Sequence, residues 1–359
     1  MVDDSTSRSR HAFLLDRIVA GIITVGLPGS VWRTATVPRY DAHTHALNRI
    51  GKSMKAVFIE RFGGPEVLKY GDLPDPVAAP GEIVIDVVAA SVNAADWKAR
   101  AGQYAQSKFP LVLGRDCSGL VSTVGSGVED LRTGDSVFGV CEAGQEGAYA
   151  EKLAVKAAII AKKPNGLSHV NAAAVALTGL TALSAIEETL KLQAGETILI
   201  QGGAGGVAGF AIQLAKYIGA RVITTTSAAN RDYVRDLGAD GIIDYNAQDF
   251  TKIVTRCDAV FDTVGGDVAQ KSFAVLKPRG RAAFIASGAQ APKPNRNDVV
   301  SLRPAVGRSR QSLQRISELL EARAVRPPEI KLYRLSEAAD AHRLSESRHF
   351  RGKLVFEVR

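Results

Sequence analysis

Glycines at fixed spacing occur after an apolar run in the middle of the chain. Gly203, Gly205 and Ala208 fit the pattern G-x-G-x-x-A, after the apolar run 197–201 and ahead of a helical hydrophobic pattern over 207–218. In this context the first glycine permits a tight turn, the second lets the backbone approach a phosphate, and the small third residue lets helix pack on strand. The pattern predicts that a dinucleotide pyrophosphate binds at the start of a helix, on Gly203, Ala204, Gly205, Gly206 and Val207. The alternative is a glycine-rich turn without a ligand.

The residues after the next β-like run, 221–226, indicate which dinucleotide is bound. An NAD enzyme usually places Asp or Glu about 20 residues beyond the first glycine, to accept a hydrogen bond from the ribose 2′-hydroxyl. No carboxylate occurs here before Asp232. Ser227 can donate to a 2′-phosphate, and Arg231 can present a charged fork to it. NADP(H) is therefore the predicted cofactor, although Arg231 could instead be a solvated charge on a helix.

Composition agrees with a two-domain enzyme. The 359 residues are 46% hydrophobic and 23% charged, which is enough material for two cores. The net charge of +8 is moderate, and without a basic block or interleaved aromatic residues it predicts no nucleic-acid partner. Cys117, Cys141 and Cys257 are odd in number and far apart in sequence, so we expect a reducing compartment, the cytoplasm, and no disulfide framework.

Residues 1–53 differ in character from the rest of the chain, and we interpret them as a poorly ordered N-terminal extension, with the folded enzyme starting at Met54. The apolar run 18–32 is short for a membrane span, and Asp3 and Asp4 do not suit the start of a signal peptide. Asp41, His43 and His45 spell D-x-H-x-H, which metal hydrolases use. The sequence offers no matching ligand set, so we interpret this motif as chance.

The remaining chain changes its pattern near residue 172. Residues 54–171 alternate β-like runs with Gly/Pro turns, whereas the later part alternates strands with helical segments, which predicts a parallel, doubly wound sheet. The fold class is therefore α/β. Strands are expected at 56–59, 82–92, 118–124, 136–140, 197–201, 221–226, 241–244, 259–262, 281–285 and 353–358, and helices at 172–186 and 309–324, the last with Leu313, Ile316 and Leu320 on one face.

Several runs together resemble one family over nearly all of 54–359. The chain is similar to the zinc-independent quinone oxidoreductases, the ζ-crystallin-like branch of the medium-chain dehydrogenases/reductases. The runs that carry this resemblance are FGGPEVLKY, SVNAADWKARAGQY, FPLVLGRDCSGLVSTVG, LTGLTA, AGGVAG, LGADGIIDY, VFDTVGG and SEAADAHRLSESRHFRGKLVFEV.

The resemblance implies two domains and a homodimer. A GroES-like, β-rich catalytic domain would comprise 54–173 and 309–359, and a Rossmann NADP(H)-binding domain would comprise 174–308.

The chain departs from the zinc alcohol dehydrogenases of the same family. Where those enzymes have an early zinc-binding Cys, this chain has a region with Asn93 and Asp96. Where they have the run G-H-E, it has Gly114, Arg115 and Asp116, and it lacks their four-cysteine lobe. Catalytic zinc needs three protein ligands and an open position. We therefore expect no metal.

Without a metal, oxidation of an alcohol is difficult, whereas an electrophilic acceptor needs mainly hydride proximity and a donor to the developing oxyanion. This favours quinones and α,β-unsaturated carbonyls as substrates. In related plant enone reductases the run N-x-x-D-x-K lines the pocket, which implies that Asn93 binds near the nicotinamide ribose and substrate and that Lys98 stabilises the oxyanion or donates a proton. Tyr104 is a further predicted pocket wall and donor. Asp96 is expected to cap the next helix, and Lys98 could instead lie on that helix's surface.

The resemblance also implies contacts with the cofactor. Thr178 would approach the nicotinamide, Tyr245 the adenosine phosphate, Thr263 and Val264 the ribose and pyrophosphate, and Lys353 would reach in from the C-terminal segment. Tyr245 could also simply end a strand.

Other functions stay open. A crystallin-like NADPH-binding protein, which could bind RNA, with little turnover is one alternative, and a zinc-type alcohol dehydrogenase is another. An enoyl-reductase module of a polyketide synthase is a third, against which the free-standing length argues.

Overall fold

The computed structural model describes residues 52–104, 108–142 and 144–359. Residues 53–359 form one compact unit. The predicted N-terminal extension and the motif formed by Asp41, His43 and His45 lie outside the described residues. The first strand begins at Ser53, one residue before the predicted start of the enzyme.

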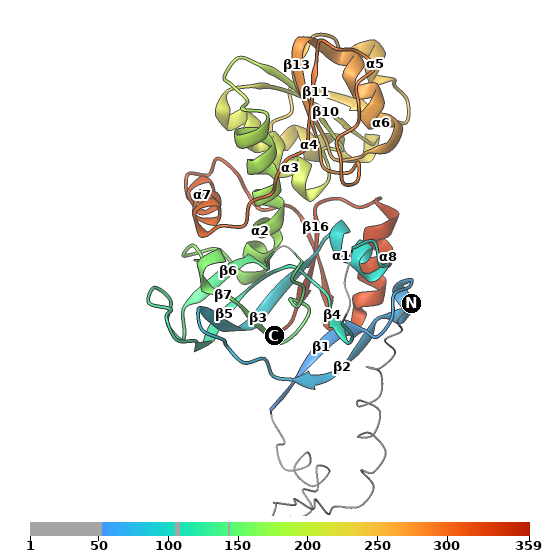
Figure 1. The fold of residues 1–359 in the computed structure, drawn as a ribbon. Coiled ribbons are helices and arrows are strands. Elements are labelled where there is room, and N and C mark those ends of the chain that lie inside the picture. Colours follow the sequence, from blue (N-terminus) through green and yellow to red (C-terminus); the bar gives the residue numbers. More distant parts are fainter. Residues whose placement is uncertain (1–51, 105–107, 143) are drawn as a thin grey trace, which may run out of the picture. The chain divides into compact units, whose positions relative to one another are not determined.

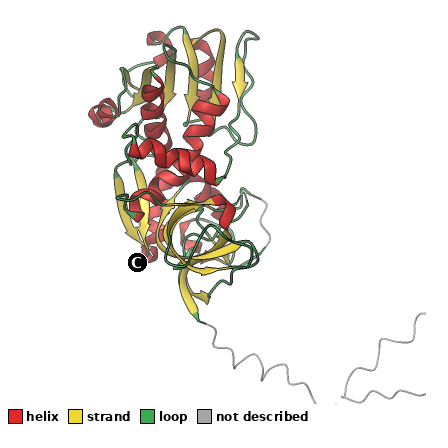
Figure 2. Cartoon of the chain, turned by 90° about the vertical axis from the view of Figure 1, so that its left-hand side faces the viewer, coloured by secondary structure: helices red, strands yellow, loops and turns green. Residues whose placement is uncertain are grey.

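Three sheets build this unit (Figures 1 and 2). A small antiparallel sheet has the order β2-β1-β4, with β1 Ser53–Ile59, β2 Lys69–Pro74 and β4 Leu111–Val112. A seven-stranded sheet has the order β15-β16-β3-β5-β6-β8, and β7 also pairs with β3. Its strands are β3 Glu82–Val92, β5 Asp116–Val124, β6 Ser136–Val140, β7 Lys152–Lys156, β8 Ile160–Lys162, β15 Ile330–Arg334 and β16 Lys353–Glu357.

The third sheet is parallel and has the order β11-β10-β9-β12-β13-β14. Its strands are β9 Thr197–Gln201, β10 Arg221–Thr226, β11 Gly241–Asp244, β12 Cys257–Asp262, β13 Leu276–Phe284 and β14 Val300–Leu302. Counted along the chain this is 3-2-1-4-5-6, the order of a dinucleotide-binding sheet, which places the ligand where the order reverses, beside β9 and β12.

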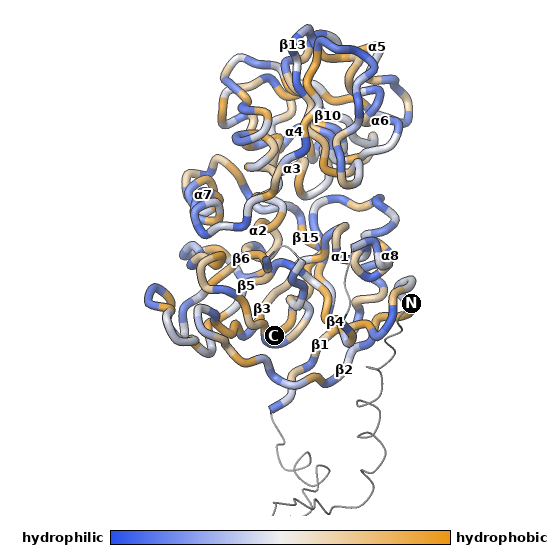
Figure 3. The backbone as a smooth tube through the Cα atoms, viewed as in Figure 1, coloured by the Kyte–Doolittle hydropathy of each residue, from blue (hydrophilic) through white to orange (hydrophobic). Residues whose placement is uncertain are grey.

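Helices cover both faces of the parallel sheet. Ile198 and Ile200 of β9 pack in a cluster with Phe210 of α3, whereas Leu199 between them packs in another cluster with Phe250 of α5. Alternate residues of a strand point to opposite faces, so both faces are buried. Figure 3 shows much of the hydrophobic colour along the strands. The helices are α1 Ala94–Arg100, α2 His169–Leu183, α3 Gly206–Ile218, α4 Arg231–Asp236, α5 Phe250–Ile253, α6 Gly266–Lys271, α7 Arg310–Glu321 and α8 Ala338–Ser347.

Helix α2 links the two large sheets, because it contacts both α3 and strands β3 and β5. Together with the π-helical turn Ser184–Thr189 it is long and apolar enough to cross a membrane by length and composition alone, but 78% of its most apolar window is buried inside the protein, as in a core helix. The predicted domain boundary at residues 173 and 174 falls inside α2. The proposed division into domains stays a prediction.

The predicted elements differ from the structure mainly at their ends. Strands β3, β6, β9, β10 and β11 have the predicted bounds. Helix α2 begins at His169 rather than Ala172, because the Ser168 side chain caps it by accepting from the Asn171 N–H. In α7 the buried face is Leu313, Ile316 and Leu319, and the predicted Leu320 is only partly buried.

Candidate cofactor and substrate site

A cavity of about 1080 Å³ opens beside the carboxyl ends of β9, β10 and β12. Its lining includes Asn93, Ala94 and Lys98 around the start of α1, and residues of the loop before α3. Other predicted site residues that line it are Thr178, Ala204, Gly205, Gly206, Val207, Ser227, Tyr245, Thr263, Val264 and Lys353. The structure does not place Gly203, Arg231 or Tyr104 among the lining residues.

The glycine loop turns one residue earlier than its pattern suggests. Positive φ, the conformation that favours glycine, occurs at Gly202 (φ 78°) rather than Gly203. Gly203 instead packs against β10, since a Cβ added there would lie 2.2 Å from Thr224 Oγ1. A Cβ at Gly205 would meet only the Gly202 carbonyl, at 3.5 Å, so Gly205 leaves space on the cavity side. Gly205 is also the N-cap of the 13-residue α3, whose first N–H groups and dipole suit a diphosphate.

At the end of β10, Ser227 lines the cavity and accepts a hydrogen bond from Asn230 Nδ2 at 3.2 Å. Asn230 also lines the cavity, whereas Arg231 is the first residue of α4 and does not. Tyr245 is 51% exposed at this end. The Thr226 hydroxyl is buried and has no hydrogen-bond partner among the described residues. This end can therefore receive a polar group, and the role of Arg231 stays a prediction.

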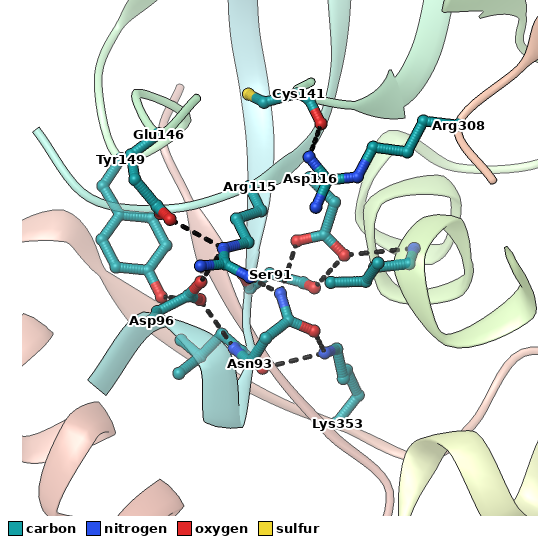
Figure 4. Close-up of polar contacts among 12 residues, drawn as sticks. Ser91, Asn93, Asp96, Arg115, Asp116, Cys141, Glu146, Tyr149, Arg308 and Lys353 are labelled. Atoms are coloured by element: carbon teal, nitrogen blue, oxygen red, sulfur yellow. Dashed lines mark hydrogen bonds and ion pairs between the residues drawn. The ribbon is translucent and has the colours of Figure 1, made fainter. Parts of the chain in front are cut away.

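Asn93 and Lys353 form one buried cluster with Asp116 (Figure 4). Lys353 Nζ donates to Asn93 Oδ1 and, at 2.8 Å, to the Val92 carbonyl. Asn93 Nδ2 donates to Asp116 Oδ1 at 2.9 Å, and Ser91 Oγ donates to Asp116 Oδ2 at 2.8 Å. Burial raises the pKa of Asp116 and lowers that of Lys353, while their opposite charges act against both shifts. Asp116 thus orients the amide and the ammonium at the cavity wall.

A second buried cluster joins Asp96 of α1 to Arg115, Glu146 and Tyr149 (Figure 4). Asp96 Oδ2 accepts from the Asn93 N–H at 2.8 Å and from the Tyr149 hydroxyl at 2.7 Å. Asn93 is therefore the N-cap of α1, and Asp96, expected as the cap, holds the third helical position, where its carboxylate reaches back to the cap. Arg115 Nε donates to Glu146 Oε1 at 2.7 Å and lies 3.8 Å from Asp96 Oδ1.

Two carboxylates share the Arg115 guanidinium, and burial decides their titration. Burial raises the pKa of Asp96 to about 6 and that of Glu146 to about 8, although Arg115 lowers both. Glu146 Oε2 has no hydrogen-bond partner in the described part of the chain. A proton on Glu146 is therefore favoured at neutral pH.

Lys98 lines the cavity, and only part of its side chain is exposed to solvent. It is half-buried, and burial together with Arg348, Arg303 and Arg115 lowers its pKa. Tyr104 is 39% exposed, and its ring lies 5.0 Å from the Arg115 guanidinium carbon. Residues 105–107, directly after Tyr104, are outside the described ranges.

Thr178 and Thr263 line the cavity, but their hydroxyls donate to the main chain, to the Ala174 carbonyl at 2.8 Å and the Gln201 carbonyl at 2.7 Å. Toward a ligand, each of these hydroxyl oxygens can therefore act as a hydrogen-bond acceptor.

Sequence reasoning missed Asp116 as an orienting group, and it also missed Asn230. Asp116 was recognised only as a departure from G-H-E, because a lone Asp after a glycine turn carries no specific signal.

The described residues contain no group of three or more His, Cys, Asp or Glu side chains that could hold a metal ion. Cys117 and Cys141 are buried, and burial raises the pKa of both thiols, that of Cys117 to about 12. Asn93 and Asp116 occupy two of the positions compared with zinc ligands, and the Asn93 side-chain amide donates a hydrogen bond to the Asp116 carboxylate. Metal independence stays a prediction.

Two family models match the chain. The alcohol dehydrogenase GroES-like domain matches residues 79–165, and the zinc-binding dehydrogenase domain matches residues 237–356. An NADPH-dependent alkenal/one oxidoreductase of Arabidopsis thaliana is 34% identical over 320 residues, covering 85% of this chain and 80% of that protein. A quinone oxidoreductase of Pseudomonas aeruginosa is 35% identical over 233 residues, covering 63% of this chain and 71% of that protein.

Solved structures agree. The quinone oxidoreductase of Coxiella burnetii has a TM-score of 0.81 at 37% identity, covering 86% of this chain and all of that one. The Escherichia coli quinone oxidoreductase, solved with NADPH, has a TM-score of 0.78 at 27% identity, covering 85% and 100%. The chain belongs to the medium-chain dehydrogenase/reductase family, in its quinone oxidoreductase branch. The resemblance and the fold class inferred from sequence are confirmed.

Proposed function

We propose that this protein is an NADPH-dependent reductase that transfers hydride to a quinone or an α,β-unsaturated carbonyl without a metal. One observation carries the proposal: a single cavity joins the glycine loop at α3 to the buried cluster of Asn93 and Lys353 and to Lys98. The similar quinone and alkenal/one oxidoreductases support the cofactor and the acceptor class. Bound NADPH supplies the hydride.

The chain's own residues have three tasks. Gly205, Gly206 and Val207 present the open N-terminus of α3 to the diphosphate. Asn93 and Lys353, linked to Asp116, hold polar groups of the cofactor beside this loop, since a Cβ at Gly206 would lie 3.5 Å from Lys353 Cδ. Lys98 Nζ donates to the acceptor oxygen as negative charge develops there, and this interaction is stronger in the transition state than with the neutral acceptor.

A panel of acceptors tests the function. NADPH oxidation is followed with 9,10-phenanthrenequinone and with an α,β-unsaturated ketone, and NADH is the matched control. We expect turnover with NADPH and at least about tenfold weaker binding of NADH, or about 1.4 kcal/mol. Arg231→Ala tests the 2′-phosphate contact. Absence of turnover on both acceptors, with NADPH bound, would favour the crystallin-like alternative.

The quaternary structure and location are further proposals. Strand β14 ends the parallel sheet and, among the described strands, pairs only with β13, and Val300 on it is 48% exposed. An unpaired edge accepts another strand, so we propose that a second copy docks here in a homodimer. Light scattering of the purified protein measures its mass.

Three buried free cysteines support a cytoplasmic location. Cationic groups that line a small-molecule cavity support a partner other than nucleic acid.

A further inference from the structure

Among the described residues, the cavity is lined by basic side chains and by no acidic ones. Lys98, Arg348, Arg351 and Lys353 line it, and within the described ranges no Asp or Glu does. Two of these cations are already neutralised or committed: Arg351 pairs with Glu329 at 2.7 Å, and Lys353 belongs to the Asp116 cluster. Lys98 and Arg348 have no ion pair with any described residue. The positive charges of Lys98 and Arg348 are therefore not balanced by any described acidic side chain.

Lys98 and Arg348 lie around one aromatic ring. The ring centroid of Trp97, on α1, is 5.5 Å from Lys98 Nζ and 6.0 Å from the Arg348 guanidinium carbon. Arg348 comes directly after α8, which contacts α1, and the only hydrogen bond of its side chain within the described ranges is to the Val264 carbonyl at 3.4 Å. The nearest acid on α8, Glu346, is engaged by Arg100. The two cations thus remain available to one ligand.

An anion beside Lys98 and Arg348 would relieve their repulsion. Burial is the first cause of the lowered pKa of Lys98, and Arg348 is the second. A carboxylate accepting from half-buried Lys98 and from exposed Arg348 would form charge-assisted hydrogen bonds, which are stronger than neutral ones. The diphosphate has its own place, the N-terminus of α3, where Arg351 adjoins Gly352, whose N–H donates to the Ala204 carbonyl at 2.9 Å.

We propose that Lys98 and Arg348 select acceptors that carry a carboxylate or a similar acidic group in addition to the quinone or enone. This inference rests on the proposed function and names the substrate class of the same cavity. Arg348 sets the preference by holding the acidic group, while Lys98 serves both that group and the reacting oxygen.

The test compares a benzoquinone carrying a carboxyalkyl side chain with its methyl ester, since the two have the same reactive ring. We expect kcat/KM for the acid to exceed that for the ester by about tenfold at low ionic strength, and the difference to shrink with added salt. Arg348→Asn keeps a residue that tolerates the left-handed φ of 57° and should remove the preference, with the ester and the NADPH Kd changed less than about twofold. Arg348→Lys should restore part of it. Arg343→Gln, an exposed change on α8, is the control.

Three results would overturn the proposal. The acid and the ester could react equally, Arg348→Asn could leave the preference intact, or Arg348→Asn could raise the NADPH Kd about tenfold, which would assign Arg348 to the cofactor diphosphate. Binding of acid and ester to the enzyme saturated with NADP⁺ is measured in parallel. If neither acceptor turns over, the proposed reaction fails, and the binding measurement still decides whether the acidic group is recognised.

Discussion

At the scale of single residues, the site depends on groups that never reach the cavity. Asp116 is fully buried and accepts from Ser91 and Asn93, and its charge opposes the loss of the proton on Lys353. Asn93 links Asp116 to Lys353, so removing the Asp116 carboxylate leaves the buried Asn93 amide without its acceptor and Lys353 with less opposite charge nearby. Asp116 is therefore a positioning residue whose removal harms folding as well as binding.

Lys98 is the residue whose catalytic role can be isolated. Lys98→Met keeps most of the length of the side chain and removes its donor, so kcat should fall by roughly 10² to 10³, the scale for one oxyanion donor. The NADPH Kd should stay nearly unchanged. Steady-state rates and a fluorescence titration measure the two quantities. Wild-type turnover in this variant would assign proton donation to another group.

Glu146 makes stability depend on pH. Its pKa is about 8 in the folded protein and near the ordinary 4.5 when unfolded. Between these values the folded chain holds a proton that the unfolded chain has released, so the free energy of unfolding should fall as pH rises. The slope for one proton is at most about 1.4 kcal/mol per pH unit.

Urea denaturation of wild type and Glu146→Gln from about pH 5 to about pH 8.5 measures this contribution. The variant should lose much of the downward slope, because its neutral amide mimics the protonated acid. Identical slopes in the two proteins would show that Glu146 titrates normally.

Sequence reasoning found residues with a motif around them and missed those that act by tertiary contact. Asn93, Lys98, Lys353 and the glycine loop apart from Gly203 reach one cavity, and each belongs to a recognisable run. Tyr104 is the last residue of such a run and Arg231 lies outside the runs, and neither lines the cavity, because one or two residues along a helix or turn change the direction of a side chain. Asp116 could not be assigned, since its hydrogen-bond partners lie on β3, directly after β3 and on α2.

At the scale of elements, different glycines of the loop between β9 and α3 serve packing and binding. Gly203 packs against β10, whereas Gly205 leaves space on the cavity side. The sequence predicted the strand and helix that flank this loop because hydrophobic periodicity is strong there. It misplaced the tight turn, because contact with β10 decides which of the neighbouring glycines Gly202, Gly203 and Gly205 takes positive φ.

Two matched substitutions test this separation. Gly203→Ala should destabilise the fold by about 1 to 3 kcal/mol, because its Cβ would overlap Thr224. Gly205→Ala should leave thermal stability nearly unchanged but weaken NADPH binding by roughly tenfold, since its Cβ would occupy the space where the backbone approaches the phosphates. Thermal melts and cofactor titrations distinguish the two. Equal effects on both quantities would contradict the assignment.

At the scale of the whole molecule, α2 holds together what the sequence presents as two domains. The sequence indicated the two kinds of sheet from the change in periodicity near residue 172. It could not show that α2 serves both, because a helix apolar on nearly all sides has no preferred partner.

Metal independence is a prediction for the protein as a whole, and removal of metal tests it. Dialysis against a strong chelator should leave turnover and thermal stability unchanged, since the positions compared with zinc ligands hold Asn93 and Asp116 in mutual contact. Elemental analysis accompanies the assay. Stoichiometric zinc whose loss abolishes activity would disprove metal independence.

Strand β16 lies between β3 and β15 in space, yet it comes after the whole parallel sheet in the chain. During translation the edge of β3 that pairs with Leu354, Val355 and Phe356 must wait for all the residues between them. At about 5 to 20 residues per second this wait lasts roughly 10 to 50 s. The ribosome-bound chain therefore carries an apolar, unpaired strand edge while its later half is made, which is the kind of surface that chaperones shield.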